Sequence, residues 1–185
     1  EWSEYQKKRK RQGPASLQRI KRLPEIPPET ADGVPVNVAA NLEFPGPVDD
    51  ILSEQKIPVG LYRTEFLYLE GSDFPDEEAQ YNYYLRLADK FAKTSVILRT
   101  FDLGSDKLRP DGRMVGEANP ALGWRGIRSM LEQPDTFKRQ IRAMLRASMF
   151  KNLRILLPMI SDVSEFKKAK RLISQVMFEL RKEKI

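Results

Sequence analysis

Four short apolar runs, each separated from the next by a longer polar stretch, constrain the fold of this chain more than any other feature of its sequence. The runs are rich in Val, Ile and Leu and too short for helices, and they occupy residues 34–40, 59–62, 95–100 and 153–158. Continuous apolarity, rather than alternation with polar residues, is typical of parallel strands that are covered on both faces. We therefore predict four parallel strands.

The stretches between the runs have helical spacing. Residues 76–93, 135–150 and 162–182 each place apolar residues on one face of a helix. Asp162 followed by Glu165 predicts a capping box at the start of the last helix. We expect the apolar residues of that helix to pack into the core, namely Val163, Phe166, Ile173, Val176 and Leu180.

The alternation of strand and helix implies an α/β protein with a parallel sheet, which is either doubly wound or a barrel. Four βα units in roughly 150 residues correspond to half of an eight-stranded barrel, which needs about 250. No Gly-rich nucleotide-binding loop follows the first run. We therefore expect a partial TIM (β/α)8 barrel of about four βα units over residues 24–185. One or two linker helices in residues 1–23 would precede it, with the domain boundary at the Pro-rich segment 24–28.

The composition excludes several kinds of chemistry. The chain of 185 residues has no Cys and no His, so it offers no thiolate and lacks the commonest general base and phosphoryl acceptor. No run approaches the roughly 20 apolar residues of a membrane helix, and residues 1–22 lack the apolar core of a signal peptide. We expect a cytoplasmic protein that makes no membrane contact.

The net charge of +6 resides in the first 22 residues, which contain eight Lys or Arg and only two acidic residues, Glu1 and Glu4. The remaining residues are neutral in sum. A basic arm that binds nucleic acid is one interpretation of residues 7–11, but no aromatic residues alternate with the basic ones as a stacking surface requires. We favour a solvated helix face and expect no nucleic-acid partner.

Two arginines lie at the carboxyl ends of predicted strands, where ligands bind in parallel α/β folds. Arg63 follows the second run and Arg99 ends the apolar part of the third. A guanidinium group matches phosphate or carboxylate oxygens with a rigid fork, so the two would converge on one anion. The alternative is structural, with each arginine held by a nearby acid, Glu65 or Asp102. The spacing alone leaves both interpretations open.

Further polar residues are less specific. Lys107 lies in a loop with Gly and Ser that could bind an anion, whereas Arg125 suits either binding or a structural role. The neighbouring Trp124 is predicted to be a packing anchor. The acidic pairs 49–50 and 77–78 are predicted to be solvated charges at helix starts, and no metal ligand is assigned in this chain.

The strand ends and the helices after them also carry motifs that resemble Enzyme I of the phosphoenolpyruvate:sugar phosphotransferase system. The motifs agree with that family in order and spacing, and the resemblance covers about residues 24–182. They are GLYRTEFLY at 60–68, LRTFDLGSDK at 98–107, NPALGWRGIR at 119–128, QIRAMLRAS at 140–148 and LPMI at 157–160.

The resemblance implies an eight-fold βα barrel that binds phosphoenolpyruvate and Mg²⁺. It further implies transfer of the phosphoryl group to a histidine of an N-terminal domain, which passes it to the carrier protein HPr, and a homodimer formed through the barrel. Arg63 and Arg99 match two arginines that hold the phosphate. Arg125 matches a third basic residue near the site, and Lys107 lies in a matching loop.

The same resemblance assigns the Mg²⁺ carboxylates and a cysteine proton donor to the second half of the barrel, and the accepting histidine to the N-terminal domain. We therefore expect residues 1–185 to be part of a longer protein and to be inactive alone. The alternative is a non-catalytic regulatory module that senses a small phosphorylated anion through the same arginines.

Overall fold

The computed structural model of the chain describes residues 28–69, 74–104 and 123–185. The predicted linker helices of residues 1–23 and the loop that contains Lys107 lie outside these ranges. No helix in the described ranges is long and apolar enough to cross a membrane.

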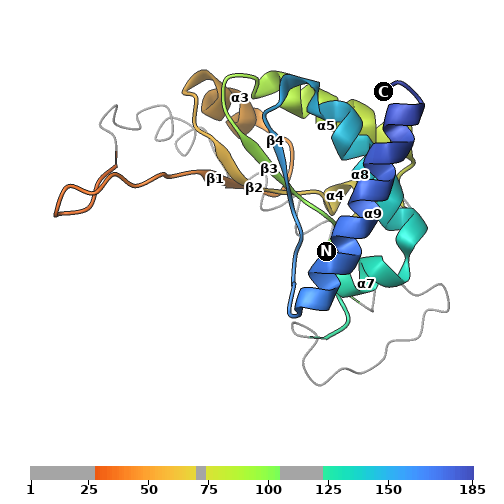
Figure 1. Ribbon diagram of the computed structural model, residues 1–185. Coiled ribbons are helices and arrows are strands. Elements are labelled where there is room, and N and C mark those ends of the chain that lie inside the picture. The colour runs from red at the N-terminus through yellow and green to blue at the C-terminus, as the bar shows by residue number, and fades with distance from the viewer. Residues whose placement is uncertain (1–27, 70–73, 105–122) are drawn as a thin grey trace.

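The centre of the fold is a sheet of four parallel strands in the order β1-β2-β3-β4 (Figure 1). The strands are β1 (Ala40–Leu42), β2 (Val59–Arg63), β3 (Val96–Arg99) and β4 (Leu153–Leu156). Each strand pairs with its neighbour in sequence, which requires a crossover connection between every parallel pair. This confirms the predicted α/β class and the parallel sheet.

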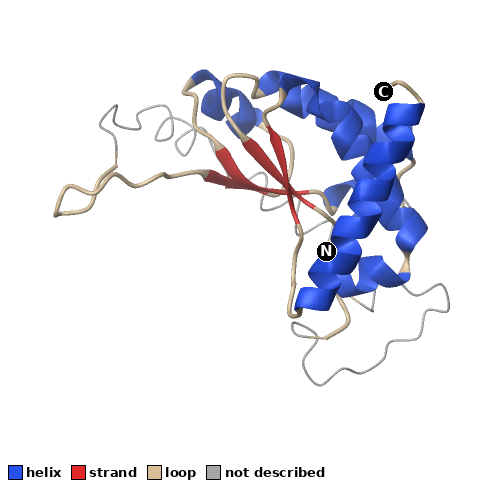
Figure 2. Cartoon of the chain, in the orientation of Figure 1, coloured by secondary structure: helices blue, strands red, loops and turns tan. Residues whose placement is uncertain are grey.

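Helices follow every strand. They are α3 (Pro47–Glu54), α4 (Phe66–Leu69), α5 (Glu77–Lys90), α7 (Ile127–Glu132), α8 (Pro134–Arg146), the 3-10 turn η1 (Ala147–Phe150) and α9 (Val163–Lys182). Figure 2 shows α5, α8 and α9 on the same side of the sheet, and α8 contacts both of the others. These three long helices therefore form a layer over one face of the sheet.

Local capping fixes where two long helices begin. Asp76 accepts a hydrogen bond from the Ala79 N–H at the start of α5. At the start of α9, Asp162 accepts from the Ser164 N–H, and Glu165 accepts in turn from the Asp162 N–H. The predicted capping box is confirmed, because these carboxylates satisfy amide groups that have no partner inside the helix.

Two apolar clusters hold the helix layer to the sheet, and Ile155 of β4 packs against both. The first lies between β2, β3 and the helices α5 and α8, and includes Tyr62, Tyr84, Phe91, Leu98 and Met144. The second joins α7, α8 and α9 below the ends of the strands, and includes Phe101, Ile127, Phe137, Ile141 and Val176.

The first predicted strand is largely wrong. Within residues 34–40 only Ala40 belongs to β1, and Val34, Val36 and Val38 are exposed. Pro35 has no N–H to donate to a sheet, and the segment forms only an isolated bridge with Glu29. Apolar composition does not make a strand where the backbone has no partner strand.

The core-facing side of α9 is also partly wrong. Val176 and Leu180 are buried as predicted, but Val163 and Phe166 are 67% and 45% exposed. Because a helix turns by roughly 100° per residue, Val163 lies well off the stripe through Ala169, Val176 and Leu180. That stripe faces α7 and α8, which contact α9.

The expectation that both faces of the sheet are covered is not met within the described residues. Along β3, Val96 and Leu98 are fully buried under the helices, whereas Ile97 and Arg99 are partly exposed. Successive side chains of a strand point to opposite faces. Arg99 therefore lies on the less covered face.

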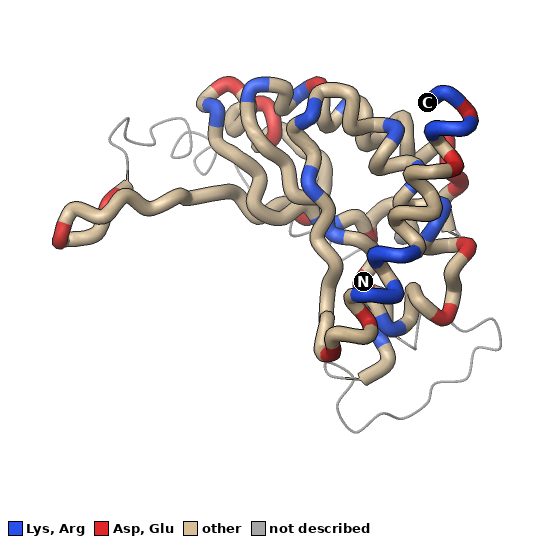
Figure 3. Tube along the Cα trace, in the orientation of Figure 1, with Lys and Arg blue, Asp and Glu red and all other residues tan. Residues whose placement is uncertain are grey.

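Charged residues of both signs lie along the same helices, as Figure 3 shows for α9. Two acidic residues depart from the prediction of solvated helix-start charges. Glu77 at the start of α5 is 24% exposed and pairs with Arg142 and Arg146. Asp49 lies in the first turn of α3 but is only 3% exposed, and its carboxylate accepts the Gly46 N–H. Ile51 and Leu52 of the same short helix are also buried, so that the helix packs closely enough against the core to bury Asp49 as well.

Candidate functional site

Arg63 and Arg99 are the last residues of β2 and β3, and the strand register places them directly opposite each other. Opposed residues in neighbouring strands project from the same face of a sheet. The side chains are 36% and 18% exposed, so both guanidinium groups remain partly accessible. The fold thus brings together the two arginines that the sequence singled out.

Arg99 is held by two carboxylates. Its Nη2 lies 2.8 Å from Glu65 Oε1 and its Nη1 lies 3.3 Å from Asp102 Oδ2. Asp102 also accepts from Arg125, whose Nε lies 2.8 Å from Asp102 Oδ1. Arg125 is brought there by a backbone bridge between its own residue and Gly104, so the third candidate arginine joins the same group.

Arg63 has a different partner from those considered in the sequence. Its Nη1 lies 3.3 Å from Glu43 Oε1, and Glu43 follows directly after β1. The structural alternative, in which Glu65 or Asp102 holds the arginines, is met for Arg99 but not for Arg63. Glu43 was missed because the first strand was predicted to end at residue 40. It ends at Leu42, so that Glu43 is the residue at its carboxyl end.

Three arginines and three carboxylates therefore form what we call the strand-end cluster, which consists of Arg63, Arg99, Arg125, Glu43, Glu65 and Asp102. Its formal charges cancel. Asp102 and Glu65 are only 6% and 15% exposed, so they act as fixed acceptors that orient the guanidinium groups. An anion would meet arginines that are already in place, in line with the cost saved by preorganisation.

Several buried polar atoms at the strand ends have no hydrogen-bond partner within the described residues. They are Arg63 Nε, Arg99 Nε, Glu65 Oε2 and Thr100 Oγ1. Buried polar groups are nearly always paired with protein, water or ligand. These unpaired atoms are concentrated at the ends of β2 and β3.

Two buried side chains that the sequence pattern does not single out support the same edge. Thr64 follows Arg63, and Gln140 projects from α8; both are fully buried and they hydrogen bond to each other. The signal that could have found Gln140 is its position as a polar residue on the apolar face of α8, between Phe137 and Ile141.

The described residues do not fit a Mg²⁺ site. They contain no group of three or more acidic side chains that could hold a metal ion, and the carboxylates of Glu65 and Asp102 are engaged by arginine. Mg²⁺ requires several oxygen ligands in octahedral geometry.

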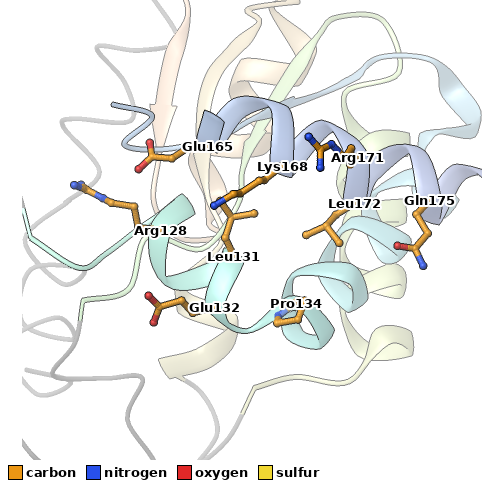
Figure 4. Close-up of a pocket in the computed structure, with 9 residues that line it drawn as sticks. All are labelled: Arg128, Leu131, Glu132, Pro134, Glu165, Lys168, Arg171, Leu172 and Gln175. Carbon is orange, nitrogen blue, oxygen red and sulfur yellow. The ribbon is translucent and has the colours of Figure 1, made fainter. Parts of the chain in front are cut away.

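A separate cavity of about 580 Å³ lies between α7, the start of α8 and α9 (Figure 4). Leu131, Leu172 and Pro134 supply apolar surface, and Lys168 and Arg171 add positive charge. None of the strand-end arginines lines this cavity. This concave surface is distinct from the strand-end cluster.

Comparison with known proteins identifies the family of this chain. The family described as "PEP-utilising enzyme, PEP-binding domain", where PEP is phosphoenolpyruvate, matches residues 17–185. The chain belongs to this family. In this chain, two opposed arginines end neighbouring parallel strands.

Curated relatives carry the name phosphoenolpyruvate-protein phosphotransferase, that of an enzyme. The protein from Staphylococcus carnosus is 38% identical over 181 residues, which is 98% of this chain and 31% of the relative. The one from Bacillus subtilis is 42% identical over 152 residues, 82% of this chain and 27% of the relative. The protein from Geobacillus stearothermophilus is 40% identical over 171 residues, with 92% and 29% covered. The PEP-binding domain described here thus spans less than a third of these relatives.

Proposed function

We propose that the strand-end cluster binds the phosphate group of phosphoenolpyruvate, within a phosphotransferase that passes the phosphoryl group to a protein histidine and then to the carrier HPr. The observation that carries this proposal is the direct opposition of Arg63 and Arg99 at the ends of β2 and β3. The names of the relatives support the choice of anion and of activity.

The chemistry requires positioning and charge neutralisation more than covalent help from the protein. Arg63 and Arg99 would grip phosphate oxygens from two sides, and Arg125 would add a third positive charge through its shared contact with Asp102. Glu65 and Asp102 hold Arg99 through two of its nitrogens, so the guanidinium plane is set before the ligand arrives. We propose Lys107 as a further contact.

We also propose that the sheet is the first half of a TIM (β/α)8 barrel over residues 24–185, after linker helices in 1–23. The sequential strand order and the single helix layer support this architecture. The partly exposed Ile97 and Arg99 would then face the interior of the barrel, which four further strands would complete.

The remaining assignments follow the same family resemblance. We propose that Mg²⁺ is bound by residues outside this chain, where it would neutralise charge on the phosphoryl group. The full-length protein would be a cytoplasmic homodimer joined through the barrel domain, with HPr as its protein partner.

Titration calorimetry with phosphoenolpyruvate on the full-length protein tests the site. Arg63→Ala and Arg99→Ala should each weaken binding by about a hundredfold, in line with the loss of one preorganised electrostatic group. Arg86→Ala is the matched control, because Arg86 lies on the exposed face of α5. Unchanged affinity in both strand-end variants would refute the proposal.

Transfer separates the enzyme from the regulatory alternative. Full-length protein that binds phosphoenolpyruvate through these arginines should also move labelled phosphate from it to HPr. Binding through Arg63 and Arg99 without any transfer would identify a sensor of a small phosphorylated anion instead.

A further inference from the structure

Gln140 connects the helix layer to the two strand ends that carry the arginines. Its side chain is fully buried on the apolar face of α8. Its Oε1 accepts the Phe101 N–H at 3.0 Å, and its Nε2 donates to Thr64 Oγ1 at 3.0 Å. One side chain of a helix thus holds the chain just beyond β2 and just beyond β3.

The donors and acceptors around Gln140 can be assigned in only one way. Thr64 Oγ1 donates to the Arg99 carbonyl at 2.9 Å, so it must accept from Gln140. The Phe101 N–H needs an acceptor, which fixes the amide oxygen of Gln140 on that side. We call the contacts of Gln140 with Thr64 and Phe101, and of Thr64 with Arg99, the Gln140–Thr64 clamp.

The clamp contacts the backbone beside the two arginines and does not contact their guanidinium groups. Thr64 is the residue after Arg63, and its hydroxyl is tied to the backbone of Arg99. A shift of either strand end would therefore stretch a buried hydrogen bond that no water can replace. The backbone positions from which both guanidinium groups extend are locked together.

A second branch leads away from the strand ends and serves as an internal comparison. Gln140 Nε2 also lies 3.2 Å from Tyr84 OH, which donates to Gln80 Oε1 at 3.2 Å. Gln80 in turn donates to the Pro75 carbonyl. Gln80 is as buried as Gln140, but its hydrogen bonds go to Tyr84 and Pro75 and not to β2 or β3. The two glutamines thus share burial and chemistry and differ in what they hold.

We propose that Gln140 is a positioning residue of the phosphoenolpyruvate site, which fixes the separation of Arg63 and Arg99 through Thr64 and the Phe101 amide. The inference rests on the proposed function of the strand-end cluster. It assigns a role in binding to a buried residue of α8, a helix on the face of the sheet opposite to the side chain of Arg99.

The test compares Gln140→Leu with Gln80→Leu in the full-length protein, with phosphoenolpyruvate affinity and thermal midpoint measured for both. Each variant removes a buried amide from the same network, so both should lower the midpoint. Only Gln140→Leu should also weaken binding, by about tenfold, as expected when a binding group is misplaced by a fraction of an ångström. Arg99→Ala is included to show that the site itself is real.

Thr64→Val provides a second route that keeps side-chain shape and does not depend on the folding of Gln140→Leu. It should reproduce the loss of affinity, and the double variant should lose no more than the larger single effect, because both substitutions break one chain of contacts.

Equal losses of affinity in Gln140→Leu and Gln80→Leu would overturn the inference, as would unchanged affinity in Thr64→Val. If Arg99→Ala binds normally, the proposed function fails, and the role of Gln140 fails with it. If Arg99→Ala loses binding while the clamp variants do not, only the role of Gln140 is refuted.

Discussion

The strand-end cluster and a second group of charges between α5, α8 and α9 are both built from arginine and carboxylate, yet they differ in how completely their atoms are paired. The second group, which we call the helix-layer network, joins Arg142 and Arg146 to Glu77, Glu78, Glu179 and Glu183. Arg142 Nε lies 2.9 Å from Glu77 Oε2, and its Nη2 lies 2.6 Å from Glu183 Oε2. Arg146 Nη1 reaches the other Glu77 oxygen at 2.7 Å.

The helix-layer network is closed, whereas the strand-end cluster is open. Among the described residues, unpaired buried atoms include the Nε of Arg63 and of Arg99 but no atom of the network. The hydrogen bond to Glu183 raises the pKa of Arg142 above its usual value. Salt bridges tie Arg142 to three acids and Arg146 to two, whereas the buried Nε atoms of Arg63 and Arg99 have no partner among the described residues.

The largest effect should separate the two groups by function. Arg99→Met should weaken phosphoenolpyruvate binding by about a hundredfold, because it removes one side of the phosphate grip. Arg99→Lys should lose less, since it keeps the charge but not the fork. Calorimetry on the full-length variants measures this. A loss as great for Arg142→Met as for Arg99→Met would break the distinction between the open and closed groups.

Arg142→Met should instead act on stability. It leaves Glu77 and Glu183 without their partner and should lower the free energy of unfolding by about 1–2 kcal/mol, at nearly unchanged affinity for phosphoenolpyruvate. Chemical denaturation followed by circular dichroism measures the change. The exposed Arg86→Met on α5 is its control, with no more than a small expected effect. Weakened ligand binding without destabilisation would contradict the structural role.

The helix-layer network should also make stability depend on pH. The hydrogen bond from Arg142 lowers the pKa of Glu183 below its ordinary value of 4.5. A depressed folded-state pKa contributes stability above the unfolded value, and that contribution is lost as the pH falls through the folded value. Thermal midpoints of the unsubstituted protein and of Glu183→Gln should therefore differ at pH 6, and the difference should shrink as the pH falls below 4.5 and through the lowered pKa. Parallel curves would exclude this linkage.

The smallest effect should come from Asp49, which belongs to neither group. Burial raises the pKa of its carboxyl, against the opposing hydrogen bond from the Gly46 N–H. A raised folded-state pKa gives stability that is present at low pH and lost as the pH rises through it. Asp49→Asn should thus raise the thermal midpoint at pH 7 by no more than about 2 °C.

The neighbouring Asp50 is the control for that substitution, because it is exposed and pairs with Lys90 at 2.6 Å. Asp50→Asn should slightly lower the midpoint by scanning fluorimetry. A gain at pH 7 for Asp49→Asn that persists unchanged at pH 4 would show that charge is not its cause.

Much of the fold followed from local signals. The continuous apolarity of residues 95–100 and 153–158 predicted β3 and β4, and the carboxylates at 162 and 165 predicted the first turn of α9. The errors arose where local composition lacked a tertiary partner. Val34, Val36 and Val38 have the composition of a strand but pair with no strand of the sheet, and Val163 has helical spacing but lies off the buried stripe of α9.

The candidate site divides in the same way. Arg63 and Arg99 were found from their position after apolar runs, because parallel strands bring their carboxyl ends to one edge. The partner of Arg63 was not found, since Glu43 depends on where β1 ends. The clamp was not found either, because Gln140 lies 76 residues from Thr64 in sequence.

The sequence by itself determined the strand–helix alternation, the helix start at Asp162 and the two arginines at strand ends, since periodicity, capping and strand-end position act within a few residues. Only the tertiary structure decided that Arg63 faces Arg99 in register, that Arg99 and Arg125 share Asp102, and that Gln140 holds both strand ends. These depend on register and on helix docking, which join segments far apart in the chain and are set by the packing of the whole core.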